Sequence, residues 1–378
     1  MRIGFSCTMI EPSITQNQID GVGFYTQHLL REYTTLQKTI LPYSFPPLKE
    51  LRMQSNVPAG STFRLPYALY TACSLITPRA ISLYPALEKK IDLFHATDHL
   101  VPKLKNKPVI ATLHDSLILT HPDWYSARLR HVKNIIRVKS VRWANHVITI
   151  SNSMLKEIVE YWGIKEKNIS VVYNGITDDW FTEISPEIRK KVIEKLGIPE
   201  NFILVVGTLQ PKKNIARIVD AYLGLPKDIQ EQYPLVIVGK AGWNTEESLA
   251  AIQRLIEKKA GHWLKYIADD DLRALFQATR LYLHPSLHEG FGLTILQAFA
   301  SRVPVITSNI TAMPEVASDA AQLVDPYSVD ELMSAIQNLL LSPVTCNELI
   351  KKGVIRARQF SWKKCAEETM QVYQTVLG

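Results

Sequence analysis

Short apolar runs alternate with amphipathic stretches along the first half of the chain. The stretches "GFYTQHLLREY" and "NSMLKEIVEYWG" carry apolar residues at helical spacing, and Ser151 or Asn152 is a suitable N-cap for the second. Strands that alternate with helices require crossover connections, which favour a mainly parallel sheet with helices on both faces. The strands expected in this half are "RIGFSC", "DLFHAT", "PVIATLHD", "HVITIS" and "ISVVYNG".

The same alternation starts again after "NGITDDWF". Because 378 residues is long for one domain, we predict two doubly wound α/β domains that meet near residues 176–188 and bind ligand in the cleft between them. Residues 45–70 carry four prolines and little periodicity, which predicts loops and short helices there. The strands expected in the second half are "FILVVGT", "LVIVGK", "LKYIA", "RLYLHPS" and "VPVITS".

Basic residues outnumber acidic ones, and the formal net charge is +7. The excess is concentrated between Trp124 and Lys156, a stretch without Asp or Glu. Neither aromatic platforms nor a known motif accompanies it, so we do not expect nucleic-acid binding. Two interpretations stay open, a solvated basic helix and a peripheral attraction to anionic lipid. The basic side chains concerned are Arg128, Arg130, Lys133, Arg137, Lys139 and Arg142.

The cysteines and the hydropathy pattern bear on the cellular compartment. The four cysteines are far apart and form no C-x-x-C pair, which is typical of buried thiols in a reducing environment. No apolar run approaches the roughly 18 residues of a membrane span, and "MRIGFSC" has the pattern of a strand rather than of a signal peptide. We therefore expect a cytoplasmic protein, free or attached to the inner face of the membrane.

Three loops that follow expected strands of the second half carry groups suited to phosphate and sugar. "GTLQPKKN" places Lys212, Lys213 and Asn214 at the expected start of a helix, and "GKAGWN" carries Lys240. In "HEGFGLTILQAF", Glu289 precedes two glycines where a strand leads into a helix. Helix N-termini and ammonium groups bind anions such as a diphosphate. Each loop alone would usually be solvated, but the carboxyl ends of parallel strands share one sheet edge.

These segments resemble the retaining, nucleotide-sugar-dependent glycosyltransferases of family 4, and most closely their mannosyltransferase-like subgroup. The resemblance covers nearly the whole chain in the order of the family and is weakest at residues 36–85. In the second half it rests on "GTLQPKKN", "LVIVGKAGWNTEE" and "HEGFGLTILQAFASRVPVITSNITAMPEVASDAAQLVDP". In the first half it rests on "GVGFYTQHLL", "DLFHATDHLVP", "TLHDSLILTHPDWY" and "ITISNSMLKEIVEYWGIKEKNISVVYNG".

The resemblance implies a GT-B fold with two Rossmann-like domains that face each other across a cleft. Residues 1–178 would bind the acceptor and residues 179–361 the nucleotide sugar, while the final helix, 362–378, would pack back onto the first domain. The family generally needs no metal or other cofactor, and the chain has no D-x-D motif at a strand end. Lys213, and with it Lys212, would then stabilise the departing diphosphate in place of a cation.

The resemblance also implies individual roles. The family pattern is a glutamate, seven residues and a second glutamate. Glu289 is at the first position and would contact the donor sugar. The second position, which contacts the ribose in the family, is Gln297 in this chain. A neutral amide there would weaken donor binding by about 1 kcal/mol. His114, in "TLHDS", would hydrogen-bond the donor sugar. The other expected donor contacts are Gly21, Gly23, Thr208, Lys212, Asn214, Lys240, Gly290, Phe291, Gly292, Leu293 and Thr294.

We therefore expect a retaining transferase that moves a hexose, mannose from GDP-mannose as the first choice, to a hydroxyl of a glycan acceptor. A lipid-linked acceptor of bacterial surface polysaccharide assembly would suit the basic helix. Two alternatives stay open: a UDP-sugar-dependent transferase with a soluble acceptor, and a catalytically silent module that binds a sugar nucleotide. Gln297, in place of the family glutamate, is the reason to consider the second alternative. The presence of Glu289, His114 and Lys213 argues against it.

Overall fold

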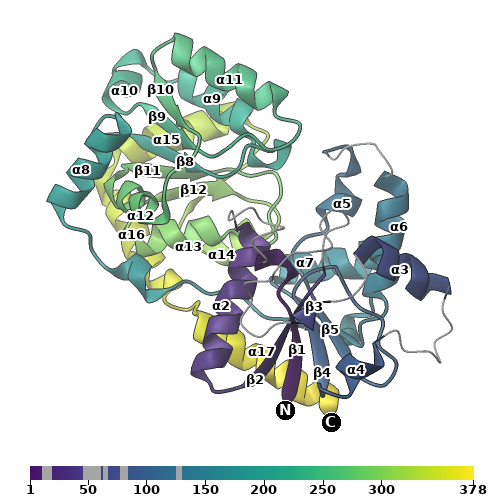
Figure 1. Ribbon diagram of the computed structural model, residues 1–378. Coiled ribbons are helices and arrows are strands. Elements are labelled where there is room, and N and C mark those ends of the chain that lie inside the picture. Colours follow the sequence, from purple (N-terminus) through teal and green to yellow (C-terminus); the bar gives the residue numbers. More distant parts are fainter. Residues whose placement is uncertain (11–18, 46–60, 63–66, 77–83, 125–129) are drawn as a thin grey trace. The chain divides into compact units, whose positions relative to one another are not determined.

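The computed structural model describes residues 1–10, 19–45, 61–62, 67–76, 84–124 and 130–378 (Figure 1). The chain forms two compact units, and each is described by itself. Unit 1 contains residues 1–122, 126–175 and 362–378, and unit 2 contains residues 123–125 and 176–361. None of the described helices is long and apolar enough to cross a membrane.

Unit 1 is built on a parallel sheet of seven described strands in the order β3-β2-β1-β4-β5-β6-β7. The order runs outward in one direction from β1 and in the other from β4, so the winding reverses between these two neighbours. At such a switch point the connections leave the sheet on opposite faces, and a crevice opens at the carboxyl ends of the strands. The strands are β1 (Arg2–Ser6), β2 (Thr39–Ser44), β3 (Ser61–Thr62), β4 (Leu93–Ala96), β5 (Val109–Leu113), β6 (His146–Thr149) and β7 (Ile169–Val171).

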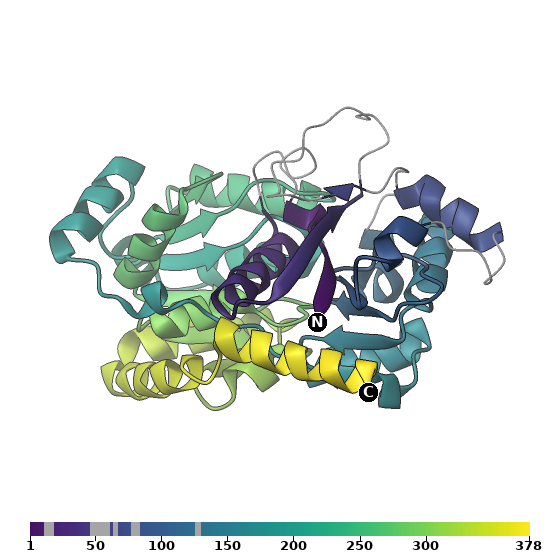
Figure 2. The ribbon, with the colours of Figure 1, turned by 60° about the horizontal axis from the view of Figure 1, so that its bottom comes forward.

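The last helix of the chain belongs to unit 1, where it lies beside the first long helix (Figures 1 and 2). Its buried Tyr373 hydroxyl lies 2.5 Å from Nδ1 of His95 on β4 and 2.9 Å from the hydroxyl of Tyr33. This network joins the final helix to the centre of the sheet. The helices of the unit are α2 (Gly21–Thr35), α3 (Tyr67–Ile76), α4 (Pro85–Glu88), α5 (Leu117–Thr120), α6 (Arg130–Val141), α7 (Asn152–Glu157) and α17 (Trp362–Leu377).

Unit 2 contains a second parallel sheet, with six described strands in the order β10-β9-β8-β11-β12-β13. Its switch point lies between β8 and β11. Strands β8, β9, β11 and β12 are buried along their whole length, as expected for strands covered on both faces. The strands are β8 (Ile203–Val206), β9 (Leu235–Val238), β10 (Gly261–Leu264), β11 (Leu281–His284), β12 (Val305–Ser308) and β13 (Gln322–Val324).

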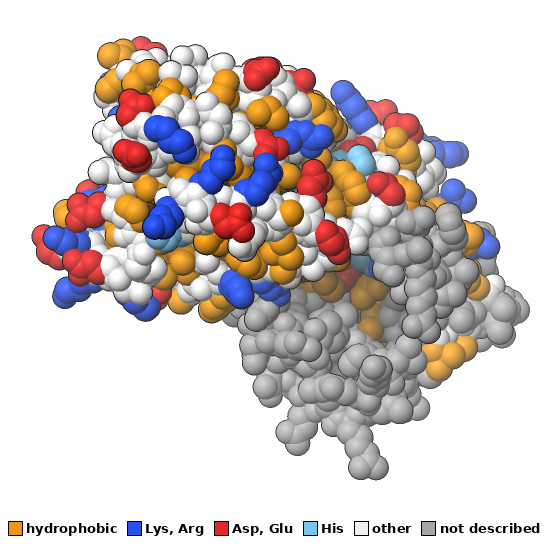
Figure 3. Space-filling view, turned by 90° about the horizontal axis from the view of Figure 1, so that it is seen from above, with side chains coloured by type: hydrophobic (Ala, Val, Ile, Leu, Met, Phe, Trp, Pro, Cys, Tyr) orange, Lys and Arg blue, Asp and Glu red, His pale blue; other side chains and the backbone are white. Residues whose placement is uncertain are grey.

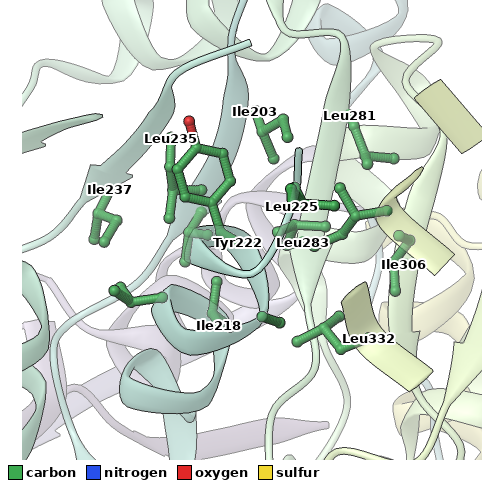
Figure 4. Packing of buried hydrophobic residues seen from close by; sticks show 14 of the residues in the cluster. Ile203, Ile218, Tyr222, Leu225, Leu235, Ile237, Leu281, Leu283, Ile306 and Leu332 are labelled. Atoms are coloured by element: carbon green, nitrogen blue, oxygen red, sulfur yellow. The ribbon is translucent and has the colours of Figure 1, made fainter. Parts of the chain in front are cut away.

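Helices cover both faces of this sheet, with α9, α11 and α15 on one and α12, α13, α14 and α16 on the other (Figure 1). Figure 4 shows the core on the first face, where Ile218 and Tyr222 of α9 pack against Ile203, Leu235 and Leu281 of the strands. The helices are α8 (Pro186–Leu196), α9 (Ile215–Leu223), α10 (Lys227–Gln232), α11 (Glu246–Glu257), α12 (Asp269–Ala278), α13 (Leu293–Ala300), α14 (Met313–Ala317), α15 (Val329–Leu341) and α16 (Pro343–Ala357).

The parallel sheets and most of the expected strands are confirmed, as is Ser151 as the N-cap of α7, where its side chain accepts from the Met154 N–H. The prediction of a strand at "LKYIA" is wrong, because β10 ends at Leu264, the first residue of that run. Strands β2, β3 and β13 were not expected. Most of residues 45–70, for which loops and short helices were predicted, lie outside the described residues.

We predict that Tyr373→Phe destabilises unit 1 by about 1–3 kcal/mol, because the buried His95 and Tyr33 each lose a hydrogen-bond partner. Urea unfolding would measure the loss. Gln374→Ala is the control, since this neighbour on α17 is exposed. A change below about 0.5 kcal/mol for Tyr373→Phe would show that the hydroxyl network does not hold the helix.

Candidate active site

Two loops meet where β8 and β11 leave the sheet of unit 2, at its switch point. The first contains a 3₁₀ turn, Pro211–Lys213, and the second runs from Pro285 to Gly292. The backbone N–H of Leu287 donates to the carbonyl oxygen of Lys212 across 2.7 Å, so the two loops are joined directly. Side chains from loops distant in sequence are thereby brought to one edge of the sheet.

Glu289 forms the centre of a cluster of charged side chains at this edge. Its Oε1 lies 2.5 Å from Nζ of Lys213, and its Oε2 lies 3.5 Å from Nζ of Lys212. The side chains of Glu289, Lys213 and Lys212 are only 11%, 15% and 17% exposed. The structure thus brings together the three charged residues that the sequence singled out, and it pairs them with one another.

Burial and charge act in opposite directions within the cluster. Burial alone would raise the pKa of Glu289, but Lys212 and Lys213 outweigh it and hold this pKa well below its usual range. The pKa of Lys213 is lowered by burial and by Lys212, against the effect of Glu289. The three groups carry a net charge of +1, so the edge stays cationic even though its carboxylate is ionised.

His284, the last residue of β11, is a member of the site that the sequence analysis missed. Its Nε2 lies 3.5 Å from Oε1 of Glu289, and its Nδ1 lies 3.1 Å from the Tyr282 hydroxyl and 3.4 Å from the Thr294 hydroxyl. Burial and the two lysines lower the pKa of His284, which keeps the ring neutral. A histidine at the end of an apolar strand, within "RLYLHPS", was the available signal.

Helix α13 begins directly beyond the glutamate loop. Gly292 is its N-cap, with a φ of +99° that an L side chain rarely adopts, which accounts for glycine at this position. Leu293, Thr294 and Gln297 are partly exposed, so the first turns of the helix are accessible. Phe291 is different: it is buried and packs edge-on against Phe360, with ring centroids 5.7 Å apart. Since the Phe291 side chain is packed in the core, the expected donor contact at this position would have to come from its backbone.

The loop after β8 also differs from expectation. Lys212 and Lys213 lie in the 3₁₀ turn, before α9 rather than in its first turn. The amide nitrogen of Asn214 donates to the carbonyl oxygens of Pro285 and Pro326, and its Oδ1 accepts from Arg217. Asn214 therefore braces the site from within and does not offer its amide to a ligand. Thr208 is half-buried and Lys240 is exposed at the same edge, after β8 and β9.

The remaining predicted residues lie in unit 1. His114 follows β5 and is half-buried; its Nε2 lies 2.9 Å from the Thr97 carbonyl oxygen, and burial lowers its pKa. Gly21 and Gly23 form the first turn of α2. A Cβ at Gly23 would lie 2.5 Å from the Met9 carbonyl oxygen, so close packing explains the glycine. Residues 11–18, before this turn, lie outside the described residues.

No group of three or more His, Cys, Asp or Glu side chains within the described part of the chain could hold a metal ion. The cations at the candidate site are instead the two ammonium groups of Lys212 and Lys213. Such groups, together with accessible backbone N–H groups at a helix start, can stabilise a diphosphate without a metal.

Comparison with known proteins decides the family. Residues 19–180 match the model of "Glycosyltransferase Family 4", and residues 188–356 match that of "Glycosyl transferases group 1". O-antigen chain mannosyltransferase B of Escherichia coli is 30% identical over 308 residues, which are 81% of this chain and 80% of that protein. The chain belongs to glycosyltransferase family 4. It is a glycosyltransferase, and the two matches divide the chain near the point where its pattern of strands restarts.

Two further similarities agree with this assignment. The O-antigen chain mannosyltransferase RfbU of Salmonella typhimurium is 29% identical over 247 residues, which are 64% of this chain and 63% of that protein. The solved structure of WaaG, a glycosyltransferase involved in lipopolysaccharide biosynthesis, has a TM-score of 0.71 at 15% identity and covers 98% of this chain and 99% of WaaG. This glycosyltransferase therefore has the GT-B fold that the sequence predicted.

We predict that the glutamate cluster makes the stability of this glycosyltransferase depend on pH. A carboxyl group whose pKa is lowered by folding stabilises the protein above its ordinary pKa, about 4.3, and loses this effect as the pH falls through the folded-state value. Glu289→Gln should therefore reduce the free energy of unfolding by about 3–5 kcal/mol at pH 7, since it leaves a buried ammonium unpaired, and by less at pH 3, which lies below the ordinary pKa.

Urea unfolding at the two pH values measures this difference. Glu183→Gln is the matched control, because Glu183 forms an ion pair with Arg302 in which both side chains are mostly exposed. An exposed pair contributes no more than about 1 kcal/mol. An equal effect of Glu289→Gln at both pH values would contradict the charge argument.

Proposed function

We propose that this glycosyltransferase is a retaining, metal-independent mannosyltransferase that transfers mannose from GDP-mannose to a hydroxyl of a growing bacterial surface glycan. The observation that carries the proposal is the buried cluster of Lys212, Lys213 and Glu289 at the switch point of unit 2. Such a cluster joins the two charges that the reaction requires, ammonium groups for a departing diphosphate and a carboxylate for the donor sugar.

The leaving group explains why two lysines are needed. Breaking the bond from the sugar to the diphosphate concentrates negative charge on the phosphate oxygens, and the transition state has oxocarbenium character. Lys213 is largely buried, so its charge acts in a medium of low dielectric constant, where it stabilises the phosphates more strongly than in water. Lys212 neutralises the second phosphate, and the first turn of α13 offers backbone N–H groups.

Glu289 has two consecutive roles in this proposal. Without ligand it pairs with the lysines, which offsets the cost of their burial. When the diphosphate binds, its oxygens replace Glu289 as the ion-pair partners of the ammonium groups, and the carboxylate of Glu289 accepts hydrogen bonds from the donor sugar. His284, which lies 3.5 Å from Glu289, keeps the carboxylate in place during this exchange.

The transferred sugar and the setting of the acceptor are inferred from the relatives, whereas GDP is our own choice of nucleotide. The two O-antigen chain mannosyltransferases support mannose as the transferred sugar, and the description of WaaG supports a setting in lipopolysaccharide synthesis. Mannose enters such reactions as a nucleoside-diphosphate derivative, for which GDP-mannose is our first choice. The nearest alternative is a UDP-sugar-dependent transferase with a soluble acceptor, and a module that binds a sugar nucleotide without catalysis is the second.

We predict that GDP, and not UDP, ADP or dTDP, stabilises the protein against thermal unfolding. At about 100 times its Kd a ligand adds roughly 2.7 kcal/mol, which is readily seen as a shift in Tm. Gln297→Glu should bind GDP-mannose about fivefold more tightly, since a carboxylate would make a charge-assisted hydrogen bond of about 1 kcal/mol with the ribose.

The outcomes separate the candidates. Stabilisation by UDP alone would refute GDP-mannose but leave the family and the proposed chemistry intact. Stabilisation by GDP without slow release of GDP from GDP-mannose would favour the silent binding module. Gln322→Glu controls for added charge, because Gln322 is exposed on β13, away from the switch point; it should leave the affinity unchanged.

We further propose that unit 1 attaches to an anionic membrane surface through α6 and its surroundings. Ile135 and Lys139 lie one turn apart on α6 and Arg142 follows the helix; Ile135 is 55% exposed, and Lys139 and Arg142 are exposed as well. Leu69 and Leu75 on the adjacent helix α3 are 45% and 41% exposed. Apolar side chains beside cations favour an interface between water and anionic lipid.

The other basic residues between Trp124 and Lys156 give less support to membrane attachment. Arg137 is half-buried, Arg128 lies outside the described residues, and the side chains of Arg130 and Lys133 are likewise not described. On the face shown in Figure 3, basic and acidic side chains of the described residues are interspersed rather than gathered into a patch of one sign. The net charge of +7 does not by itself indicate membrane binding. The combination of exposed apolar and basic side chains on α3 and α6 does.

We predict that Lys139→Glu combined with Arg142→Glu weakens binding to liposomes that contain phosphatidylserine by more than tenfold. Each basic residue near such a surface contributes about 1 kcal/mol, and the reversed charges add repulsion. Cosedimentation at low and physiological salt would measure the effect. Lys89→Glu with Lys90→Glu makes the same change in net charge at exposed positions of unit 1 after α4. Equal binding by both double variants would remove the membrane proposal.

A further inference from the structure

Unit 1 has a switch point of its own, between β1 and β4, and Asp98 lies there. The residue before it, Thr97, donates its hydroxyl to the carbonyl oxygen of Ser6 at the end of β1, across 3.1 Å. The carbonyl oxygen of Thr97 in turn lies 2.9 Å from Nε2 of His114, which follows β5. Asp98 thus leaves the sheet where three neighbouring strands end, at the place where open α/β sheets bind ligands.

The carboxyl group of Asp98 is buried but only half satisfied. The residue is 3% exposed, and its Oδ1 accepts a hydrogen bond of 2.7 Å from the Leu100 N–H. Its Oδ2 is buried without a hydrogen-bond partner among the described residues. A buried polar atom without a partner costs stability, so its presence calls for an explanation. Structural carboxyl groups in this unit differ: Glu88, also buried, accepts from the backbone N–H groups of both Lys105 and Asn106.

The surroundings of Asp98 leave its charge finely balanced. Burial raises its pKa to about 7, the Leu100 N–H and Arg137 on α6 act to lower it, and Asp20 at the start of α2 acts to raise it. The nearby rings of His99 and His114 are kept neutral, because burial lowers the pKa of each. The carboxyl group can therefore donate or accept a hydrogen bond near neutral pH.

We infer that Asp98 binds a hydroxyl group of a pyranose acceptor at the carboxyl edge of the unit 1 sheet. A sugar hydroxyl both donates and accepts hydrogen bonds, and so complements a carboxyl group with one unpaired oxygen. The alternative of a metal ligand lacks support, since the described residues contain no cluster able to hold a metal ion. This inference rests on the proposed function, because only a glycan acceptor makes a pyranose the expected ligand.

Asp98→Asn tests the inference, because the amide keeps the oxygen that accepts from Leu100 and removes the ionisable group. The assay is transfer from GDP-mannose to methyl α-mannopyranoside, with release of GDP in the absence of acceptor as a second readout. We expect kcat/KM for the acceptor to fall at least tenfold, while acceptor-free release of GDP and the thermal shift by GDP stay within twofold of those of the wild type. Asp92→Asn is the matched control: Asp92 precedes β4, at its amino end, and its carboxylate is already paired with Arg2.

A stability measurement excludes a purely structural role. A carboxyl group whose pKa is raised by folding destabilises the protein progressively as the pH rises through about 7, so Asp98→Asn should have a Tm at pH 8 equal to or above that of the wild type. A lower Tm together with a loss of acceptor-free release would identify Asp98 as structural and overturn the inference. Unchanged transfer by Asp98→Asn would also overturn the inference. The same holds if the wild type releases GDP but does not use methyl α-mannopyranoside as an acceptor. Absence of any GDP binding or release would instead refute the proposed function, and this inference with it.

Discussion

The reversal of strand order in each parallel sheet is the constraint on which the described chemistry depends. Connections between parallel strands are right-handed, so a sheet wound outward in both directions must contain one pair of neighbours whose connections leave on opposite faces. In unit 2 this pair is β8 and β11, and in unit 1 it is β1 and β4. The backbone alone therefore forms a crevice at each switch point, and Glu289 and Asp98 are buried carboxyl groups that lie there.

The ion pair between Lys213 and Glu289 has the properties of a stand-in for a ligand. A buried ammonium group without a partner is strongly destabilising, so a site that binds a diphosphate, as we propose for this one, needs a counter-ion while it is empty. Glu289 supplies it, at the cost of competing with the phosphates when they bind. In the proposed complex this competition is eased because Lys212, at 3.5 Å, is held less closely than Lys213, at 2.5 Å, and because the carboxylate would gain hydroxyl partners from the sugar. The cluster can therefore exchange partners without ever exposing a lone buried charge.

Sequence predicted the fold well where the physical signal is local and repeated. Short apolar runs between turn residues, such as "FILVVGT", are typical of strands buried on both faces, and motifs in the order of the family located Lys213 and Glu289. What it did not predict depends on contacts between distant segments. His284 lies within an apolar strand and becomes a polar neighbour of Glu289 only through the loop between them. Asn214 is a plausible anion ligand in sequence, yet its amide is engaged by carbonyl groups 71 and 112 residues away. The strand predicted at "LKYIA" was misplaced for a similar reason. The observed strand β10, "GHWL", mixes polar with apolar residues and becomes a strand only by pairing with β9.

Asp98 and Glu289 are buried carboxyl groups that lie next to the switch points of the two sheets, and their opposite pKa shifts follow from their neighbours. Two lysines keep Glu289 ionised, whereas no described side chain hydrogen-bonds to Oδ2 of Asp98, and Arg137 only partly offsets its burial. An ionised carboxylate among cations suits a charged donor whose own anions can replace it. A carboxyl group whose pKa is raised by burial suits a neutral acceptor, because a hydroxyl group brings no charge with which to offset its desolvation. The difference in electrostatics between the two edges thus matches the difference in charge between the two proposed substrates.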